Sequence, residues 1–182
     1  DVGGFEAEME AQRRRSKDSR ETVDLTAQAS LDQLAGSVGA TAFTGYTATA
    51  ADSAKVVGLL VNGSPVDVVR AGEKAEVLLD ATPFYAESGG QVGDHGVLRG
   101  AGGLEVAVSD VQKAAGGRLF VHACEVLTGE LRAGAAVSAA VDEDLRRRIT
   151  AHHTATHLLQ SALKAVLGPD TCQQGSLVTA SR

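Results

Sequence analysis

The sequence predicts an α+β fold, with an N-terminal helix, an antiparallel glycine-rich β-barrel, and a long helix that opens a further α+β domain. Glycine is abundant, at 21 residues, while aromatic residues make up only 3% and Trp is absent. Short β-branched runs separated by glycine turns fill the middle of the chain, and one long helical pattern follows them. These observations divide the chain into residues 1–40, 41–141 and 142–182.

The N-terminal part predicts a helix over residues 4–20. Its acidic residues come first and its basic residues last, as the helix dipole favours. Its apolar content is thin, so we interpret it as the tail of a preceding helical region. Residues 21–41 have mixed character and are interpreted as a linker with a short helix around residues 30–34.

The middle part predicts a small antiparallel barrel. Apolar, β-branched runs recur between turns such as Asn62-Gly63 and Ala133-Gly134, and a glycine-rich break covers residues 89–103. Strands at this spacing are typical of a barrel. The predicted strands are residues 56–61, 66–69, 75–79, 104–108, 119–126 and 136–141.

Residues 142–167 predict the clearest helix of the chain. Acidic residues 142–144 suit its start, and Gly168-Pro169 suits its end. The residues of one amphipathic stripe recur at helical spacing; they are Leu145, Ile149, Thr156, Leu159, Leu163 and Val166. After Pro169, residues 172–178 predict the start of another strand.

Composition limits the classes of function. A net charge of −6 argues against a generic polyanion binder. Cys124 and Cys172 form neither a CxxC pair nor a disulfide framework, which favours reduced thiols in the cytoplasm. No apolar run reaches the roughly 20 residues that span a membrane, and no signal pattern opens the chain. Because it begins at Asp1 and ends at Arg182 after an apolar stretch, we expect an internal part of a longer protein.

His153 and His157 are the candidate metal ligands. Positions i and i+4 lie on one helix face, where two imidazoles can chelate a tetrahedral metal ion. Thr154 stands where the HExxH proteases have their Glu, so a protease of that type is not indicated. Spacing alone leaves ordinary surface histidines as an alternative. Two ligands also do not complete a zinc site, which takes four, or three and a water.

Residues 83–96, PFYAESGGQVGDHG, form a second candidate motif. Its glycines allow positive φ and close approach of a ligand. The motif lacks the GK[ST] of a phosphate loop, and a long hairpin explains it as well as a ligand-contact loop does. The basic run at residues 146–148 likewise suits either a solvated helix face or contacts to phosphates.

Together these motifs resemble the alanyl-tRNA synthetase family. GFEAEMEAQRRRSK resembles the end of that enzyme's tRNA-recognition region, and PFYAESGGQVGDHG resembles the glycine-rich signature of its β-barrel. HHTATHLLQSALKAVLG followed by QQGSLV resembles the opening of its editing domain. The three blocks follow the family's order and cover essentially the whole chain. On this resemblance, residues 142–182 are the N-terminal part of a truncated editing domain.

The resemblance implies roles for individual residues. The family's editing domain hydrolyses tRNA(Ala) wrongly charged with serine or glycine, using zinc held by HxxxH and a later CxxxH pair. His153 and His157 match the first ligand pair, so this chain would carry half of the zinc site. Thr156 and Gln173 match catalytic positions of the editing site. The matching substrate-binding positions are Gly89, Gly90, Gly93 and Asp94.

The resemblance also implies a parent activity, the ATP-dependent attachment of alanine to tRNA(Ala). ATP and Mg²⁺ would act outside this chain, which alone should neither charge tRNA nor edit it efficiently. Three alternatives stay open: a free-standing Ser-/Gly-tRNA(Ala) deacylase, a threonyl-tRNA synthetase editing domain, and a non-catalytic barrel that binds RNA or a protein partner. We expect tRNA(Ala) as the partner and no membrane association; the sequence carries no signature of oligomeric state.

Overall fold

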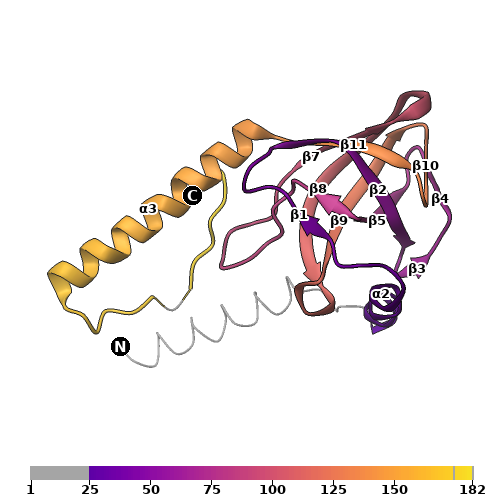
Figure 1. Ribbon diagram of the computed structural model, residues 1–182. Coiled ribbons are helices and arrows are strands. Elements are labelled where there is room, and N and C mark those ends of the chain that lie inside the picture. Colours follow the sequence, from indigo (N-terminus) through magenta and orange to yellow (C-terminus); the bar gives the residue numbers. More distant parts are fainter. Residues whose placement is uncertain (1–24, 174, 182) are drawn as a thin grey trace.

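A computed structural model describes residues 25–173 and 175–181 of the chain (Figure 1). The helix predicted over residues 4–20 lies outside the described residues. Within them, helix α2 (Leu25–Ser37) precedes a β-barrel, and the long helix α3 (Glu143–Leu167) follows it. An α+β fold with a closed antiparallel barrel is therefore confirmed.

Within the described residues, six antiparallel strands close the barrel in the order β11, β7, β8, β9, β5 and β2, and β11 pairs with β2 to complete the ring. Closure leaves no free edge among these six strands. Their bounds are β2 (Ala50–Val61), β5 (Lys74–Leu79), β7 (Gly96–Gly100), β8 (Leu104–Ala114), β9 (Leu119–Thr128) and β11 (Ala136–Val141).

Short strands extend the barrel at its rims. β3 (Ser64–Pro65) pairs with the end of β2, and β4 (Val68–Arg70) pairs antiparallel with β10 (Glu130–Arg132). β1 (Ala42–Phe43) runs parallel to β6 (Ala81–Thr82). Two 3-10 turns, η1 (Ala101–Gly103) and η2 (Ala115–Gly117), join β7 to β8 and β8 to β9.

Two of the strand predictions need correction. Residues 89–103 were predicted as a break, but they contain β7. The glycines of this segment conceal the strand pattern in the sequence. Glycine is required at Gly96, because a Cβ there would collide with the carbonyl oxygen of Ala140 on β11. Residues 172–178, predicted as a strand, form none in their described part; Val178 makes only an isolated bridge with Gln91.

The core has two parts. Inward-facing aliphatic side chains and Phe84 fill the barrel interior. A second cluster lies outside the barrel wall, where Leu31 and Ala35 of α2 pack on Leu60, Leu78 and Leu119. The short helix predicted around residues 30–34 is thus present and longer than predicted. This part of the predicted linker covers one side of the barrel.

Helix α3 begins and ends as the sequence predicts. The Asp142 side chain accepts a hydrogen bond from the Leu145 amide at 2.9 Å, and Gly168 ends the helix with φ of 109°. The helix then extends away from the barrel (Figure 1). Ile149 is its one buried residue within the described part of the chain. None of the helices described there is long and apolar enough to cross a membrane.

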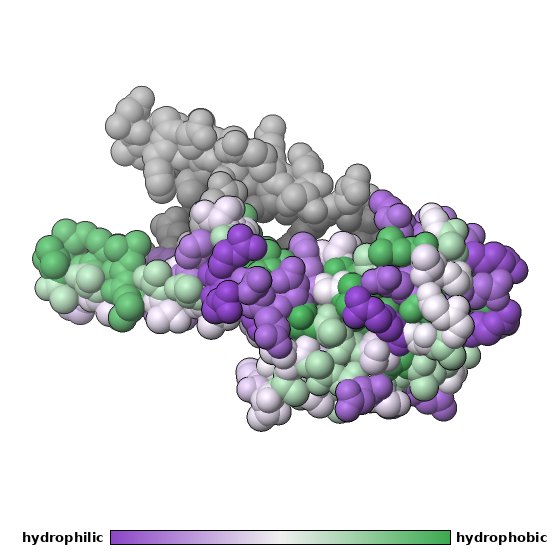
Figure 2. Space-filling model, turned by 90° about the horizontal axis from the view of Figure 1, so that it is seen from above, coloured by the Kyte–Doolittle hydropathy of each residue, from purple (hydrophilic) through white to green (hydrophobic). Residues whose placement is uncertain are grey.

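The distal half of α3 exposes an apolar surface. Figure 2 shows it as the hydrophobic end of the molecule. It is formed by Leu158, Leu159, Val166 and Leu167, which are 60–80% exposed. The stripe predicted from the sequence is therefore buried at Ile149 and largely open further along.

Candidate functional site

Arg146 anchors the start of α3 to the barrel. Its guanidinium pairs with Asp94, donating from Nε at 3.0 Å and also from a terminal nitrogen. The same group donates to the carbonyl oxygens of Gly45 at 3.2 Å and Pro83 at 2.6 Å. The Asp94 side chain is 2% exposed and also accepts from the Tyr85 amide at 2.6 Å. The direction of the helix is thereby fixed.

This geometry gives two of the predicted substrate-binding residues a structural role. The Asp94 carboxylate is used within the protein, as described above. Gly93 packs against β8, where an added Cβ would lie 2.5 Å from Asp110 Oδ1 and 2.6 Å from the Val111 amide nitrogen. Contact of either residue with a substrate stays a prediction.

The tip of the glycine-rich loop is a tight hairpin turn. Ser88 and Gln91 exchange backbone hydrogen bonds, both of 3.1 Å. Gly89 and Gly90 between them have φ of 62° and 83°. Positive φ at both central residues matches a two-residue hairpin and requires glycine or a similar residue. The hairpin interpretation of this motif is thus supported.

The C-terminal segment packs on this tip. The Val178 amide donates to the Gly90 carbonyl at 2.7 Å, and the Val92 amide donates to the Val178 carbonyl at 3.2 Å. A Cβ at Gly90 would lie 2.5 Å from the Ser176 carbonyl oxygen. The segment also reaches α3, where Nδ1 of His152 lies 2.8 Å from the carbonyl oxygen of the next residue, Thr179.

His153 and His157 lie side by side on α3, and His153 contacts the glycine-rich loop. Their ring centroids are 4.9 Å apart and the rings are inclined by 22°. Nδ1 of His153 lies 2.6 Å from Oε1 of Gln91. The structure therefore brings one member of the predicted metal pair, His153, into contact with the glycine-rich loop; metal binding itself stays a prediction.

The two predicted catalytic residues occupy different positions. Gln173 is exposed and lines a cavity of about 440 Å³ together with Gly89, Gly90, Gly175 and Ser176. Thr156 is half-buried on α3 and donates to the His152 carbonyl at 2.9 Å. Three predicted site residues thus share one cavity, which Thr156 does not line.

The donor set fits zinc in part. Neutral imidazoles are normal zinc ligands, and this pair has the required i, i+4 spacing. No group of three or more His, Cys, Asp or Glu side chains comes together among the residues that the structure describes. The described residues thus offer two candidate ligands, and a half-site for zinc stays a prediction.

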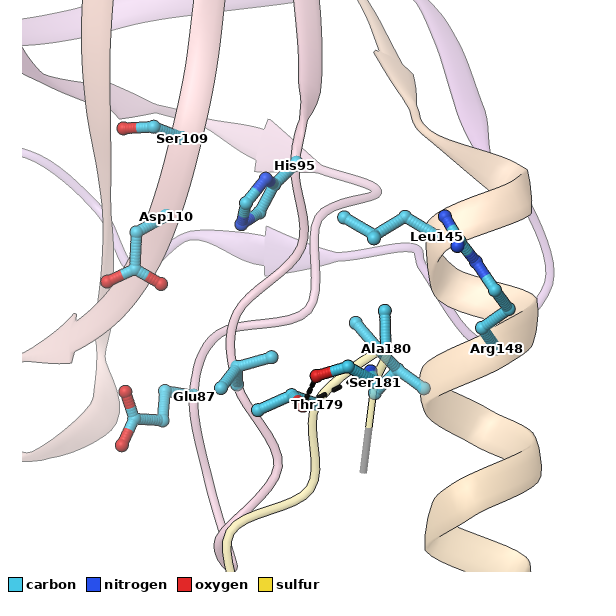
Figure 3. A pocket seen from close by; sticks show the side chains of 11 residues that line it. Glu87, His95, Ser109, Asp110, Leu145, Arg148, Thr179, Ala180 and Ser181 are labelled. Carbon is cyan, nitrogen blue, oxygen red and sulfur yellow. Dashed lines mark hydrogen bonds between the residues drawn. The ribbon is translucent and has the colours of Figure 1, made fainter.

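A second cavity, of about 530 Å³, lies between the barrel, the start of α3 and the C-terminal segment. Figure 3 shows Glu87 and Asp110 on its barrel side and Arg148 on α3. Its lining includes none of the predicted site residues. It is therefore a different surface from the histidine pair.

Sequence reasoning missed the roles of two residues. Arg146 was interpreted as part of a solvated or phosphate-binding run, but its side chain is only 16% exposed and holds α3. The sequence motif that contains Gln91 does not show that its side chain contacts His153. The place of Gln91 directly after two turn glycines was the available signal, because such a residue has a fixed backbone position.

Comparisons with known proteins agree with these motifs. The family described as tRNA synthetases class II (A) matches residues 1–145. An alanine--tRNA ligase of Synechococcus sp. (strain JA-3-3Ab) is 54% identical over 182 residues, covering 100% of this chain and 20% of the relative. The chloroplastic/mitochondrial alanine--tRNA ligase of Arabidopsis thaliana is 52% identical over 187 residues, covering 100% and 19%.

The corresponding enzyme of Ostreococcus lucimarinus is 51% identical over 178 residues, covering 97% of this chain and 20% of the relative. The chain thus spans about a fifth of the length of these relatives. The resemblance to alanyl-tRNA synthetases is confirmed along essentially the whole sequence. The chain belongs to the class II tRNA synthetase family, and its similarity within that family is to alanine--tRNA ligases.

Proposed function

We propose that this chain is part of an alanine--tRNA ligase and contributes half of a zinc site that edits Ser-tRNA(Ala) and Gly-tRNA(Ala). The names of its relatives support the ligase assignment. The observation that carries the editing assignment is the stacked His153–His157 pair, whose His153 contacts the glycine-rich loop through Gln91. That the relatives are about five times longer than the chain favours a longer ligase over a free-standing deacylase.

Zinc bound at the completed site would supply a Lewis acid and a template for the mischarged amino acid. The chain's own residues would do the rest. The two imidazoles offer ligands from one helix face, and a later CxxxH pair would complete the set. Gly89 at the loop tip has open space around it, so its backbone can approach the end of the tRNA, whereas Gly90 packs against Ser176. The exposed Gln173 amide can donate to and accept from the aminoacyl ester.

Discrimination against alanine has a physical basis. Serine differs from alanine by one hydroxyl group, and a site that ligates or hydrogen-bonds this hydroxyl disfavours the amino acid that lacks it. The site that attaches alanine discriminates less well, because an apolar pocket rejects small analogues of its amino acid only weakly. Editing therefore removes serine by recognising a group that correctly charged tRNA(Ala) does not carry.

The other parts of the proposal concern the whole protein. The ligase would attach alanine to tRNA(Ala) with ATP and Mg²⁺ bound outside this chain. We propose a cytoplasmic location for the complete ligase. Two of the relatives described above are chloroplastic/mitochondrial enzymes, so the compartment differs among similar proteins.

A deacylation assay on the complete ligase that contains this chain tests the editing assignment. His153→Ala should slow hydrolysis of Ser-tRNA(Ala) by at least about 100-fold, because loss of a ligand should exceed the 10–100-fold typical of groups that only support one. Alanine charging should be unchanged. His95→Ala serves as the control, since His95 is exposed and lines the other cavity, whose lining includes neither His153 nor His157. Hydrolysis at the wild-type rate in His153→Ala would contradict the assignment.

A further inference from the structure

Gln91 makes a side-chain contact to the proposed metal pair that comes from the barrel. Its Oε1 lies 2.6 Å from Nδ1 of His153, although the two residues are 62 positions apart. Gln91 is 8% exposed. Because Gln91 is buried and its contact with His153 is short and partly buried, we expect this side chain to have a specific role.

The backbone of Gln91 is held on both sides, which fixes where its side chain can reach. On one side it closes the turn with Ser88. On the other side it forms a parallel bridge with Val178, whose amide and carbonyl bond to Gly90 and Val92. The amide group is thus delivered to α3 from a rigid position.

The contact determines which nitrogen of His153 is available for a metal. A carbonyl oxygen only accepts hydrogen bonds, so Nδ1 carries the proton and donates it to Gln91. In a neutral imidazole the other nitrogen, Nε2, then holds the lone pair. Hydrogen bonds of this kind from outside the ligand set commonly fix the tautomer and orientation of metal-binding histidines.

We propose that Gln91 is a positioning residue, which holds His153 in the Nδ1-protonated form and presents Nε2 to zinc. This inference rests on the proposed zinc site, but its first step concerns the protein without metal. It also assigns the glycine-rich loop a second task. Besides reaching the substrate side, the loop makes the ligand geometry on α3 depend on the barrel.

The tautomer of His153 is the direct test. The ¹⁵N-labelled chain is studied by NMR at a mildly alkaline pH. The wild type should show mainly Nδ1–H at His153. Gln91→Leu should shift the ratio of the two forms roughly tenfold toward Nε2–H, as expected for loss of one neutral hydrogen bond. Gln91→Glu keeps an acceptor and should restore the wild-type signature.

A matched control is Gln112→Leu. Gln112 is an exposed glutamine on β8 whose amide bonds to Glu87 and Asp110. It should leave the His153 tautomer unchanged. Backbone amide spectra of each variant establish that the fold is retained, and the Glu variant keeps the test decisive where Gln91→Leu disturbs the loop.

Zinc affinity, measured by competition with a chelating dye on the same proteins, is the second readout. Gln91→Leu should bind zinc about 10–100-fold more weakly than the wild type, while Gln91→Glu should not. An unchanged tautomer or unchanged zinc affinity in Gln91→Leu would overturn the positioning role. If His153→Ala binds zinc as the wild type does, the proposed zinc site is wrong. The tautomer measurement on Gln91→Leu does not depend on zinc, so it tests the effect of Gln91 on His153 separately.

Discussion

Among single residues, His122 is a titratable group whose pKa is shifted strongly and for a clear structural reason. It is fully buried in β9, and Nδ1 lies 2.9 Å from the Val77 carbonyl oxygen, to which it donates. The Thr82 hydroxyl, 2.8 Å away, then donates to Nε2. Desolvation by burial lowers the pKa of His122 to about 4, and backbone hydrogen bonds oppose the shift only in part. The ring is therefore neutral in the folded protein.

This burial predicts a loss of stability in mild acid. The folded pKa lies below the unfolded value of about 6.5, so the unfolded chain binds the proton first as pH falls. The free energy of unfolding should be constant above pH 6.5 with respect to this group and should fall between about pH 6.5 and 4. The total loss should be about 3 kcal/mol. Urea unfolding at a series of pH values measures it.

His122→Gln provides the comparison, because it removes the titration while keeping a polar side chain. The difference in slope between the two proteins isolates His122. Glu76 contributes with the opposite sign, since burial raises its pKa and its contribution is lost as pH rises, but it is common to both proteins and cancels. Identical pH dependence in wild type and His122→Gln would contradict the assignment.

Among the elements, α3 is anchored to the barrel through its first turns. Arg146 pairs with buried Asp94, and Ile149 is buried nearby, whereas the distal half is open to solvent. The first turns of the helix are therefore held by specific contacts. The position of the histidine pair relative to the loop follows from this anchor.

Replacing Arg146 by Met should destabilise the protein by about 3–5 kcal/mol, because the Asp94 carboxylate would be left buried without its partner. Urea unfolding followed by circular dichroism measures the change. Arg147→Met is the matched control. Arg147 is a neighbouring arginine whose side chain is 76% exposed and pairs only within the helix with Asp144, as far as the described contacts show, so its loss should change stability by less than about 1 kcal/mol. Equal effects of the two substitutions would argue against the anchor.

At the scale of the whole molecule, the barrel encloses its own core while the C-terminal part leaves both an apolar surface and a ligand set open. The apolar surface is the distal half of α3, and the proposed ligand set is the histidine pair. Both features suit a domain that is completed by further structure. The proposal of a longer ligase accounts for the two together.

The zinc affinity of the chain tests the proposed half-site. A complete structural site binds zinc with roughly 10–16 kcal/mol, and two imidazoles supply only half of the usual four ligands. We expect weak zinc binding by residues 1–182. Binding should become much tighter in a protein extended at the C-terminus to supply the CxxxH pair. Competition with a chelating dye compares them, and equal affinity in the two proteins would count against the shared site.

Local sequence patterns by themselves determined the class of the fold, the barrel, both ends of α3, and the shared helix face of His153 and His157. These features depend on short-range periodicity, capping and turn chemistry, which neighbouring residues specify. The same patterns missed β7, because its glycines are required by contact with β11 and not by local preference. They also predicted a strand at residues 172–178, where the described residues instead pack on the loop tip.

Only the tertiary structure decided the contacts that connect the barrel to α3. Arg146 meets Asp94 across 52 positions of sequence, and His153 meets Gln91 across 62. No periodicity links residues so far apart, since their meeting depends on barrel closure, on strand register and on the direction in which α3 leaves the barrel. The sequence thus identified the pair of imidazoles, while the fold alone determined which neighbour contacts His153 and which charge holds the helix in place.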